Sequence, residues 1–199
     1  MNLFDQIIIQ PNVVPDHHIH ELMKLVNQET SYATVGSSDD QDVEHTTRKT
    51  LWYPVPHEML LNLNSAVMSC YDQFIHKKYN SKVKNIEPVQ FLGYPVGGHY
   101  IEHNDSENFE DGKWKRMAHR DITILYYLND NYTGGELEFT QLGLTIKPKK
   151  GMMIAFPSYK DFAHKVHPVT WGHRYTLVSW VATQKHLYDT IPRPGIPEN

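Results

Sequence analysis

The chain has 199 residues, of which 40% are hydrophobic and 21% charged, and its formal net charge is −4. This length and composition suit a soluble globular protein that forms one domain with a substantial core. The acidic balance argues against a nucleic-acid-binding protein, which needs a cationic surface, and the short apolar runs argue against a transmembrane helix.

The N-terminal region, residues 1–85, is predicted to be a helical support for the rest of the domain. Residues 3–14 have the pattern of a strand that enters a turn. Asp16 is a suitable N-cap for a helix over residues 17–27. One stripe of that helix is apolar, namely Ile19, Leu22, Met23 and Val26.

A long aperiodic segment separates this helix from the next one. Residues 28–50 are rich in Ser, Thr and Asp and are predicted to form a loop. Loops of this length often act as lids or binding segments. A second helix is predicted from about Pro56 to Lys78, because apolar residues recur there at helical spacing: Leu60, Leu63, Val67, Tyr71 and Phe74.

From residue 86 onward the sequence changes to short strands separated by turn residues such as Gly134-Gly135. The predicted strands cover residues 87–94, 99–104, 120–128, 136–140, 143–147, 152–156, 162–168 and 173–182. This pattern indicates a mainly β fold, a double-sheet jelly roll over residues 86–182 with the N-terminal helices packed on one sheet. Residues 183–199 are predicted to be an extended tail, so the whole chain is interpreted as one domain.

His103 and Asp105 lie two residues apart in one predicted strand. Side chains at this spacing share a strand face, so both are expected to point into one cavity. His164 is the best candidate for a third ligand from another strand. Two imidazoles and a carboxylate suit Fe(II), because three coordination positions stay open for cosubstrate and O2. Since the chain has 13 histidines, the His-x-Asp pair alone would be weak evidence.

A second group of residues strengthens this interpretation. Pro168 and Gly172 predict a turn, so Arg174 is expected to return along a strand beside His164. A guanidinium binds a carboxylate through two charge-assisted hydrogen bonds, and a dicarboxylic cosubstrate would supply that anion. The alternative is that Arg174 forms a structural salt bridge and that His164 is an ordinary hydrogen-bonded histidine. Three residues share the strand face of Arg174, namely Thr176, Val178 and Trp180.

The motifs, taken together, resemble those of the prolyl 4-hydroxylase type of 2-oxoglutarate/Fe(II) dioxygenase. The proximal motif is Tyr94-Pro-Val-Gly-Gly-His-Tyr100-Ile-Glu-His103-Asn-Asp105. The next strand and turn are Arg120-Asp-Ile-Thr123-Ile-Leu-Tyr126-Tyr127-Leu128-Asn129 and Gly134-Gly135-Glu136-Leu137. Phe156-Pro157 precedes the distal part, His164-x-Val166-x-Pro168-Val169 with Gly172, Arg174 and Trp180. The resemblance covers roughly residues 86–182 and is specific in order and spacing.

The resemblance implies a double-stranded β-helix core and a set of site residues. It implies that Fe(II) is bound by His103, Asp105 and His164, with no catalytic side chain beyond these ligands. It also implies that Arg174 holds the distal carboxylate of 2-oxoglutarate.

Other residues are implied as cosubstrate or substrate contacts. Tyr127 and Tyr94 match tyrosines that reach the cosubstrate in some family members, although both are equally well explained as core aromatics. Thr176 either assists Arg174 or simply favours a strand. The residues assigned to the substrate pocket are Trp180, Arg120 and Tyr100, and Trp180 is equally well explained as a core residue.

The implied activity is a hydroxylation that consumes 2-oxoglutarate and O2 and releases succinate and CO2, with ascorbate as a candidate reductant. A prolyl residue in a protein or peptide is the leading substrate hypothesis. One alternative is the same iron chemistry on a free amino acid or another protein side chain. Others are a cupin-like metalloenzyme without cosubstrate and a non-catalytic jelly-roll binding protein. A nucleobase demethylase is disfavoured, because those enzymes carry a second arginine soon after the position of Arg174.

Two segments are expected to surround the substrate. Residues 106–119 begin directly after Asp105 and are longer than in some relatives, so they are predicted to shape the mouth of the site. Together with residues 28–50 they are candidates for clamping an extended peptide. The single cysteine, Cys70, and the lack of an apolar signal core at the N-terminus lead us to expect a reducing, cytoplasmic location without nucleic-acid or membrane partners.

Overall fold

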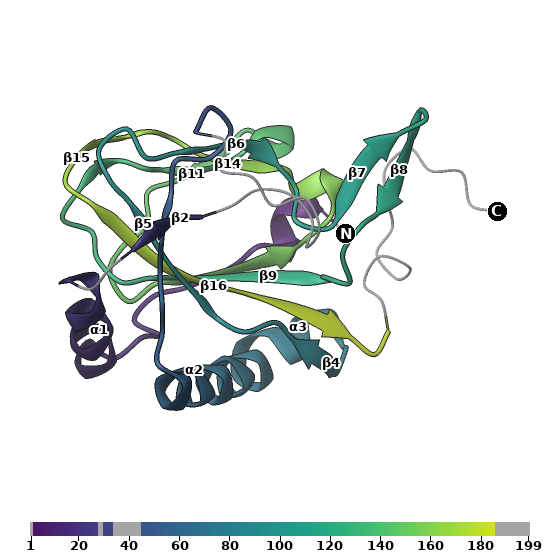
Figure 1. Cartoon of the computed structure of the whole chain (residues 1–199). Coiled ribbons are helices and arrows are strands. Elements are labelled where there is room, and N and C mark those ends of the chain that lie inside the picture. The colour runs from purple at the N-terminus through teal and green to yellow at the C-terminus, as the bar shows by residue number, and fades with distance from the viewer. Residues whose placement is uncertain (1, 28–29, 34–44, 186–199) are drawn as a thin grey trace.

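The computed structural model describes residues 2–27, 30–33 and 45–185. Two β-sheets lie face to face in it, and the helices cover the outer face of the larger sheet (Figure 1). The layers are therefore helices, major sheet and minor sheet. This is the mainly β jelly roll with N-terminal helices on one sheet that the sequence predicts, so the predicted fold class is confirmed.

The major sheet contains eight strands and is antiparallel in all its pairings. In spatial order its strands are β1 (Ile8–Gln10), β13 (Met153–Pro157), β9 (Ile122–Tyr127), β16 (Arg174–Thr183), β5 (Gln90–Tyr94), β3 (Leu51–Tyr53) and β2 (Ser31–Tyr32), while β4 (Val83–Ile86) also pairs with β16. The long strand β16 thus lies at the centre of the sheet and pairs with β9, β5 and β4.

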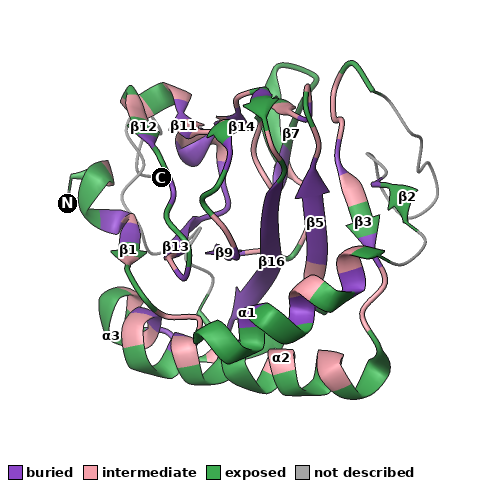
Figure 2. Ribbon diagram, turned by 90° about the vertical axis from the view of Figure 1, so that its left-hand side faces the viewer, coloured by how far each residue is buried: buried purple, intermediate pink, exposed green. Residues whose placement is uncertain are grey.

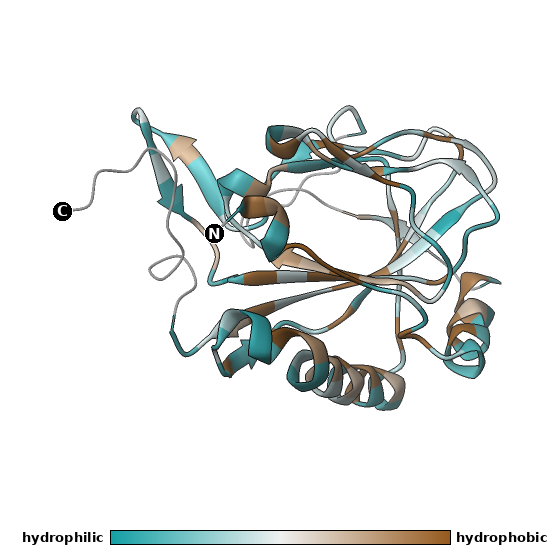
Figure 3. Ribbon diagram, turned by 180° about the vertical axis from the view of Figure 1, so that it is seen from behind, coloured by the Kyte–Doolittle hydropathy of each residue, from teal (hydrophilic) through white to brown (hydrophobic). Residues whose placement is uncertain are grey.

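The minor sheet contains four strands in the order β12 (Leu144–Ile146), β11 (Leu137–Phe139), β14 (His164–Val166) and β6 (Tyr100–His103). Two small ribbons complete the β structure: β7 (Glu107–Glu110) with β8 (Lys113–Arg116), and β10 (Thr133–Gly134) with β15 (Val169–Trp171). The β7–β8 hairpin projects from the body of the molecule and is largely hydrophilic (Figures 1 and 3).

The helices lie against the outer face of the major sheet (Figure 2). They are α1 (Asp16–Met23), α2 (His57–Cys70) and α3 (His76–Tyr79), with a π-helical turn at Tyr71–Ile75 between the last two. Short 3-10 turns lie at Leu3–Gln6, Lys24–Asn27, Thr140–Leu142 and Lys160–Phe162. Within the described residues, no helix is long and apolar enough to cross a bilayer.

Strand alternation divides the core into two parts. On β9 the side chains of Ile122, Ile124 and Tyr126 face the helices, whereas Leu125 and Tyr127 face the space between the sheets. Both sets are buried, which explains why every residue of this strand except Thr123 is apolar or aromatic. The part of the core between the two sheets also holds the polar residues of the candidate site described below.

All eight predicted strands exist, but the N-terminal region is less helical than predicted. Strands β1 to β4 come from it and extend the major sheet, so it is a mixed rather than a helical support. Residues 3–6 form a 3-10 turn instead of the predicted strand, which is limited to β1. Asp16 lies inside α1, and Pro15 is the N-cap, with no side-chain hydrogen bond.

Two predicted loops also contain strands. Within residues 28–50, β2 joins the edge of the major sheet, and Arg48 forms a bridge with Tyr100 of β6. Residues 106–119 hold the β7–β8 hairpin. Both segments lack core-facing periodicity because their strands are exposed or lie at sheet edges. The predicted tail lies mostly outside the described residues, from residue 186 onward, and the single-domain boundaries stay a prediction.

Candidate active site

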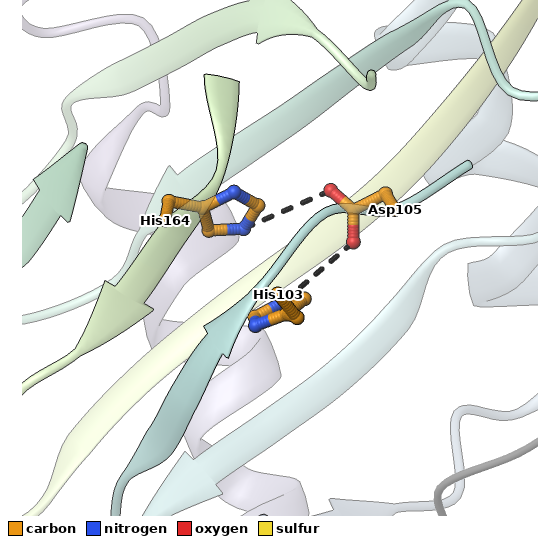
Figure 4. Close-up of side chains that lie close together, drawn as sticks. All are labelled: His103, Asp105 and His164. Atoms are coloured by element: carbon orange, nitrogen blue, oxygen red, sulfur yellow. Dashed lines mark ion pairs between the residues drawn. The ribbon is translucent and has the colours of Figure 1, made fainter. Parts of the chain in front are cut away.

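Three side chains from two distant parts of the sequence converge between the two sheets (Figure 4). Oδ1 of Asp105 lies 3.7 Å from Nε2 of His103, and Oδ2 lies 3.7 Å from Nε2 of His164. One ligand atom from each residue lies within 4.8 Å of the other two. The structure therefore brings together the three residues that the sequence predicts as a metal-binding set.

The neighbouring strands of the minor sheet fix this arrangement. His103 on β6 is the direct cross-strand partner of His164 on β14. Asp105 differs from the prediction, because β6 ends at His103 and the carboxylate comes from the bend that follows. Its backbone N–H donates to the carbonyl of Ser158 at 3.0 Å, which fixes the bend against the end of β13.

Both histidine rings are oriented by the backbone. Nδ1 of His103 donates to the carbonyl of Ile101 at 2.8 Å, and Nδ1 of His164 donates to the carbonyl of Phe162 at 3.0 Å. A carbonyl can only accept, so each Nδ1 carries the proton and each Nε2 has a free lone pair. The Nε2 atoms are the ones nearest Asp105. Both histidines are therefore in the tautomer that lets Nε2 bind a metal beside the carboxylate.

Asp105 is held as a carboxylate by its neighbours. Thr123 on β9 donates its hydroxyl to Oδ2 of Asp105 at 2.6 Å, and the hydroxyls of Thr123 and Ser158 lie 2.8 Å apart. Burial acts to raise the pKa of Asp105, but His164, His103 and the hydrogen bond from Thr123 outweigh it and lower that pKa. The group is therefore an anion between two imidazoles.

The ring of His103 is covered by an aromatic stack. Tyr100 lies parallel to it, with 3.6 Å between the ring centroids, and the guanidinium of Arg48 lies 4.8 Å from the centre of the Tyr100 ring. Burial, followed by the proximity of His164, lowers the pKa of His103 to about 3. The imidazole is consequently neutral near pH 7 and available as a ligand.

This donor set fits a divalent transition metal. Two imidazole nitrogens and one carboxylate, approaching from one side, form the arrangement that leaves several positions open on Fe(II). The free Nε2 lone pairs of the two histidines and the negative charge of Asp105 would bind such an ion. The arrangement also explains why an aspartate is tolerated between two histidines in a buried place.

Arg174 begins β16 and is almost fully buried. The prediction that its strand lies beside that of His164 is wrong, because β16 belongs to the major sheet and β14 to the minor sheet, but both side chains line one pocket. Its guanidinium lies over the rings of Tyr94 at 4.5 Å and Tyr127 at 5.0 Å, and Nη2 is 3.5 Å from the Tyr127 hydroxyl. Among the ion pairs of the described residues, none involves Arg174, and its Nε and Nη1 lack a hydrogen-bond partner. A buried cation in that situation needs an anionic ligand.

The metal-binding set and Arg174 share one pocket of about 470 Å³. Its lining also includes five aliphatic side chains, Leu92, Leu125, Leu137, Val166 and Val178. Tyr94 also lines it, whereas Tyr127 and Thr176 are buried behind the lining. Thr176 lies on the inward face of β16 opposite Tyr127. The predicted cosubstrate residues are thus close together, with Arg174 and Tyr94 at the surface of the pocket.

The three residues predicted for the substrate lie along the same pocket. Arg120 makes two hydrogen bonds to Glu87, at 2.6 and 2.7 Å, and its guanidinium stacks 3.8 Å above the ring of Trp180. The indole Nε1 of Trp180 is buried without a partner. Tyr100 stacks on the ring of His103.

Sequence reasoning missed several residues of this site. Thr123 was a detectable one, because it is the polar residue at an inward position of an otherwise apolar strand. Arg48, Tyr32 and Trp52 line the pocket but come from the aperiodic N-terminal segment, where no local pattern indicates their position.

The comparison with protein families agrees with this geometry. The model of the 2OG-Fe(II) oxygenase superfamily matches residues 89–182, the stretch that contains all three residues of the metal-binding set and Arg174. The chain is similar to this superfamily over that stretch, a little under half of its length. This similarity indicates an oxygenase that uses Fe(II), 2-oxoglutarate and O2.

Curated relatives of this oxygenase include prolyl hydroxylases. It is 23% identical over 186 residues to a provisionally named prolyl 4-hydroxylase of Acanthamoeba polyphaga mimivirus, covering 87% of the chain and 73% of that protein. It is 27% identical over 188 residues to prolyl 4-hydroxylase subunit alpha-1 of Gallus gallus, covering 85% of the chain. The oxygenase spans only 34% of the length of that animal subunit.

Solved structures show the same fold. A Trichoplax adhaerens prolyl hydroxylase, in complex with a peptide fragment of the hypoxia inducible factor oxygen degradation domain, matches with a TM-score of 0.69 at 21% identity, covering 94% of this oxygenase and 88% of that chain. A viral collagen prolyl hydroxylase from Paramecium Bursaria Chlorella virus-1 matches with a TM-score of 0.62 at 22% identity, covering 88% and 95%.

Proposed function

We propose that this oxygenase hydroxylates prolyl residues in a protein or peptide, with Fe(II) bound by His103, Asp105 and His164 and with 2-oxoglutarate anchored by Arg174. The observation that carries the proposal is the convergence of these four side chains on one pocket. A metal-binding set and an anion-seeking guanidinium in a single cavity suit a ligand with one chelating end and one carboxylate end.

The chain's own residues would divide the work as follows. His103 and His164 present Nε2 lone pairs, and Asp105 supplies a charge that Thr123 keeps in place. Bound Fe(II) would activate O2 for insertion of an oxygen atom into a C–H bond.

Arg174 would determine which 2-oxo acid is accepted. Burial makes a carboxylate on Arg174 more favourable than it would be in water, because the competing solvent is removed. Burial also raises the pKa of Tyr127, so its phenol stays protonated and keeps its contact with Nη2 of Arg174. A cosubstrate without a distal carboxylate would leave the guanidinium unpaired.

A peptide substrate is supported by the open side of the pocket. Tyr32 and Trp52 line it there and are about 40% exposed, which suits contact with an incoming chain. The β7–β8 hairpin starts two residues after Asp105 and carries two exposed aromatics, Phe109 and Trp114. The relatives named as prolyl hydroxylases, one of them in complex with a peptide, favour proline as the target.

Mass spectrometry tests the proposal. The chain would be incubated with Fe(II), 2-oxoglutarate, ascorbate and a panel of proline-containing peptides, with free proline and other free amino acids in parallel. We expect at least one peptide to gain one oxygen atom at proline, with an equal amount of succinate. His164→Ala is the inactive control.

Other outcomes distinguish the alternatives. Oxygen gain by a free amino acid but by none of the peptides would replace the prolyl-peptide substrate while keeping the iron chemistry. Absence of succinate under every condition would contradict an active oxygenase and favour a binding protein. Repeating the reaction without ascorbate tests its proposed role as the reductant that maintains activity over many turnovers.

A further inference from the structure

A tyrosine outside the predicted site lies next to Arg174. Tyr132 belongs to the loop between β9 and β10 and is buried. A Cβ atom built on Gly135 would lie 2.9 Å from Cδ of Arg174 and 3.2 Å from the ring of Tyr132. Both side chains therefore pack against the same glycine, and any larger residue there would separate them.

The hydroxyl of Tyr132 has no hydrogen-bond partner, although it is buried. Nε and Nη1 of Arg174 are in the same situation. Buried polar groups are usually paired, and each unpaired one costs free energy. One acceptor and two donors without partners, placed around a common glycine, indicate groups that complete their hydrogen bonds when a ligand is present.

The loop that carries Tyr132 is fixed to the residues on either side of Arg174. Asn129 donates to the carbonyl of His173 at 2.7 Å and accepts from the backbone N–H of Tyr175 at 2.8 Å. A Cβ on Gly172 would lie 3.2 Å from the Cα of Tyr132, so the chain turns closely around this residue. Such anchoring holds a side chain in a fixed position relative to the guanidinium.

Resting on the proposed function, we propose that Tyr132 is a positioning residue for the distal carboxylate of the cosubstrate. When the cosubstrate is bound, the Tyr132 hydroxyl accepts a hydrogen bond from the Arg174 guanidinium and so fixes the plane in which the remaining N–H groups meet the carboxylate. The pKa of Tyr132 also reflects how near the two side chains are. Burial raises that pKa, and the positive charge of Arg174 opposes the rise. Tyr132 thereby contributes to the choice of a dicarboxylic 2-oxo acid.

The test compares binding of two ligands to the Mn(II)-loaded chain by calorimetry. These are 2-oxoglutarate and 2-oxopentanoate, which has a methyl group where the distal carboxylate would be. In Tyr132→Phe we expect the Kd for 2-oxoglutarate to rise by about tenfold, the loss of one hydrogen bond to a charged group. The Kd for 2-oxopentanoate should stay unchanged.

A matched control is Tyr126→Phe, because Tyr126 also has a buried hydroxyl without a partner but faces the helices. It should leave both Kd values unchanged. Tyr132→Met, which also lacks the hydroxyl, replaces the first variant if that one fails to fold. Equal weakening of both ligands would overturn the proposal, because it would show a packing defect, and so would an unchanged Kd for 2-oxoglutarate. If the unmodified chain binds Mn(II) but not 2-oxoglutarate, the proposed function fails first.

Discussion

Tyr100 stacks face to face on the imidazole of His103, with 3.6 Å between the ring centroids and 18° between the ring planes. The stack, together with the hydrogen bond from Nδ1 to Ile101, leaves the ring one orientation. A ligand that is already oriented loses less entropy when it binds a metal, so the stack should contribute to metal affinity.

Tyr100→Ala should therefore weaken Fe(II) binding, whereas Tyr100→Phe should preserve it. Removing the ring frees His103 to rotate, and we expect about a tenfold lower affinity, in the range typical for residues that support metal ligands. The measurement is an anaerobic Fe(II) titration of each variant. Equal loss in both would show that the hydroxyl, and not the stack, is responsible.

Thr123→Val should lower Fe(II) affinity by about 10- to 100-fold. The variant keeps the volume of the side chain but removes the 2.6 Å hydrogen bond to Asp105. Thr133→Val is the control, since its hydroxyl bonds only to Thr170 in an exposed ribbon. The same titration measures both variants, and matching affinities would contradict the role given to Thr123.

His164→Ala and His167→Ala form a second matched pair. His164 faces the space between the sheets, whereas His167, three residues further along the chain, bonds to Glu138 at 2.6 Å. The first should abolish stoichiometric metal binding and succinate formation, because only two ligands remain. The second should retain both. Metal content after dialysis and a succinate assay decide the matter, and activity in His164→Ala would contradict the ligand assignment.

Arg174→Lys should raise the KM for 2-oxoglutarate by about tenfold or more, with a smaller effect on kcat. Lysine keeps the charge but cannot form two parallel hydrogen bonds to a carboxylate. Arg116→Lys is the control, because that arginine pairs with Asp121 at 3.0 Å outside the pocket. Steady-state kinetics with varied 2-oxoglutarate measure the change, and an unchanged KM would show that the distal carboxylate binds elsewhere.

The sequence predicts the sheets well because their strands carry strong local patterns. Strands such as β9 and β13 are almost entirely apolar and lie between turn residues, and β16 places Arg174 and Trp180 on one face. Edge strands give no such signal. β2 and the hairpin β7–β8 are exposed, so nothing in their hydrophobic pattern distinguishes them from loops.

The site could be predicted only as far as motifs and alternation extend. His103 and His164 were identified, but the position of Asp105 beyond the end of β6 depends on a backbone hydrogen bond to Ser158. Contacts of that kind join residues about fifty positions apart and have no local sequence pattern. The same holds for Tyr132, which packs against Arg174 through the turn geometry of two glycines.

The visible absorption spectrum of the chain under anaerobic conditions, with Fe(II) and 2-oxoglutarate added in turn, tests the central claim most directly. A charge-transfer band that appears only after the second addition would show that the 2-oxo acid chelates the iron. We predict this band, at one equivalent of each, in the unmodified chain and in His167→Ala but not in His164→Ala. A full band in His164→Ala, or none in an unmodified chain that has bound iron, would contradict it.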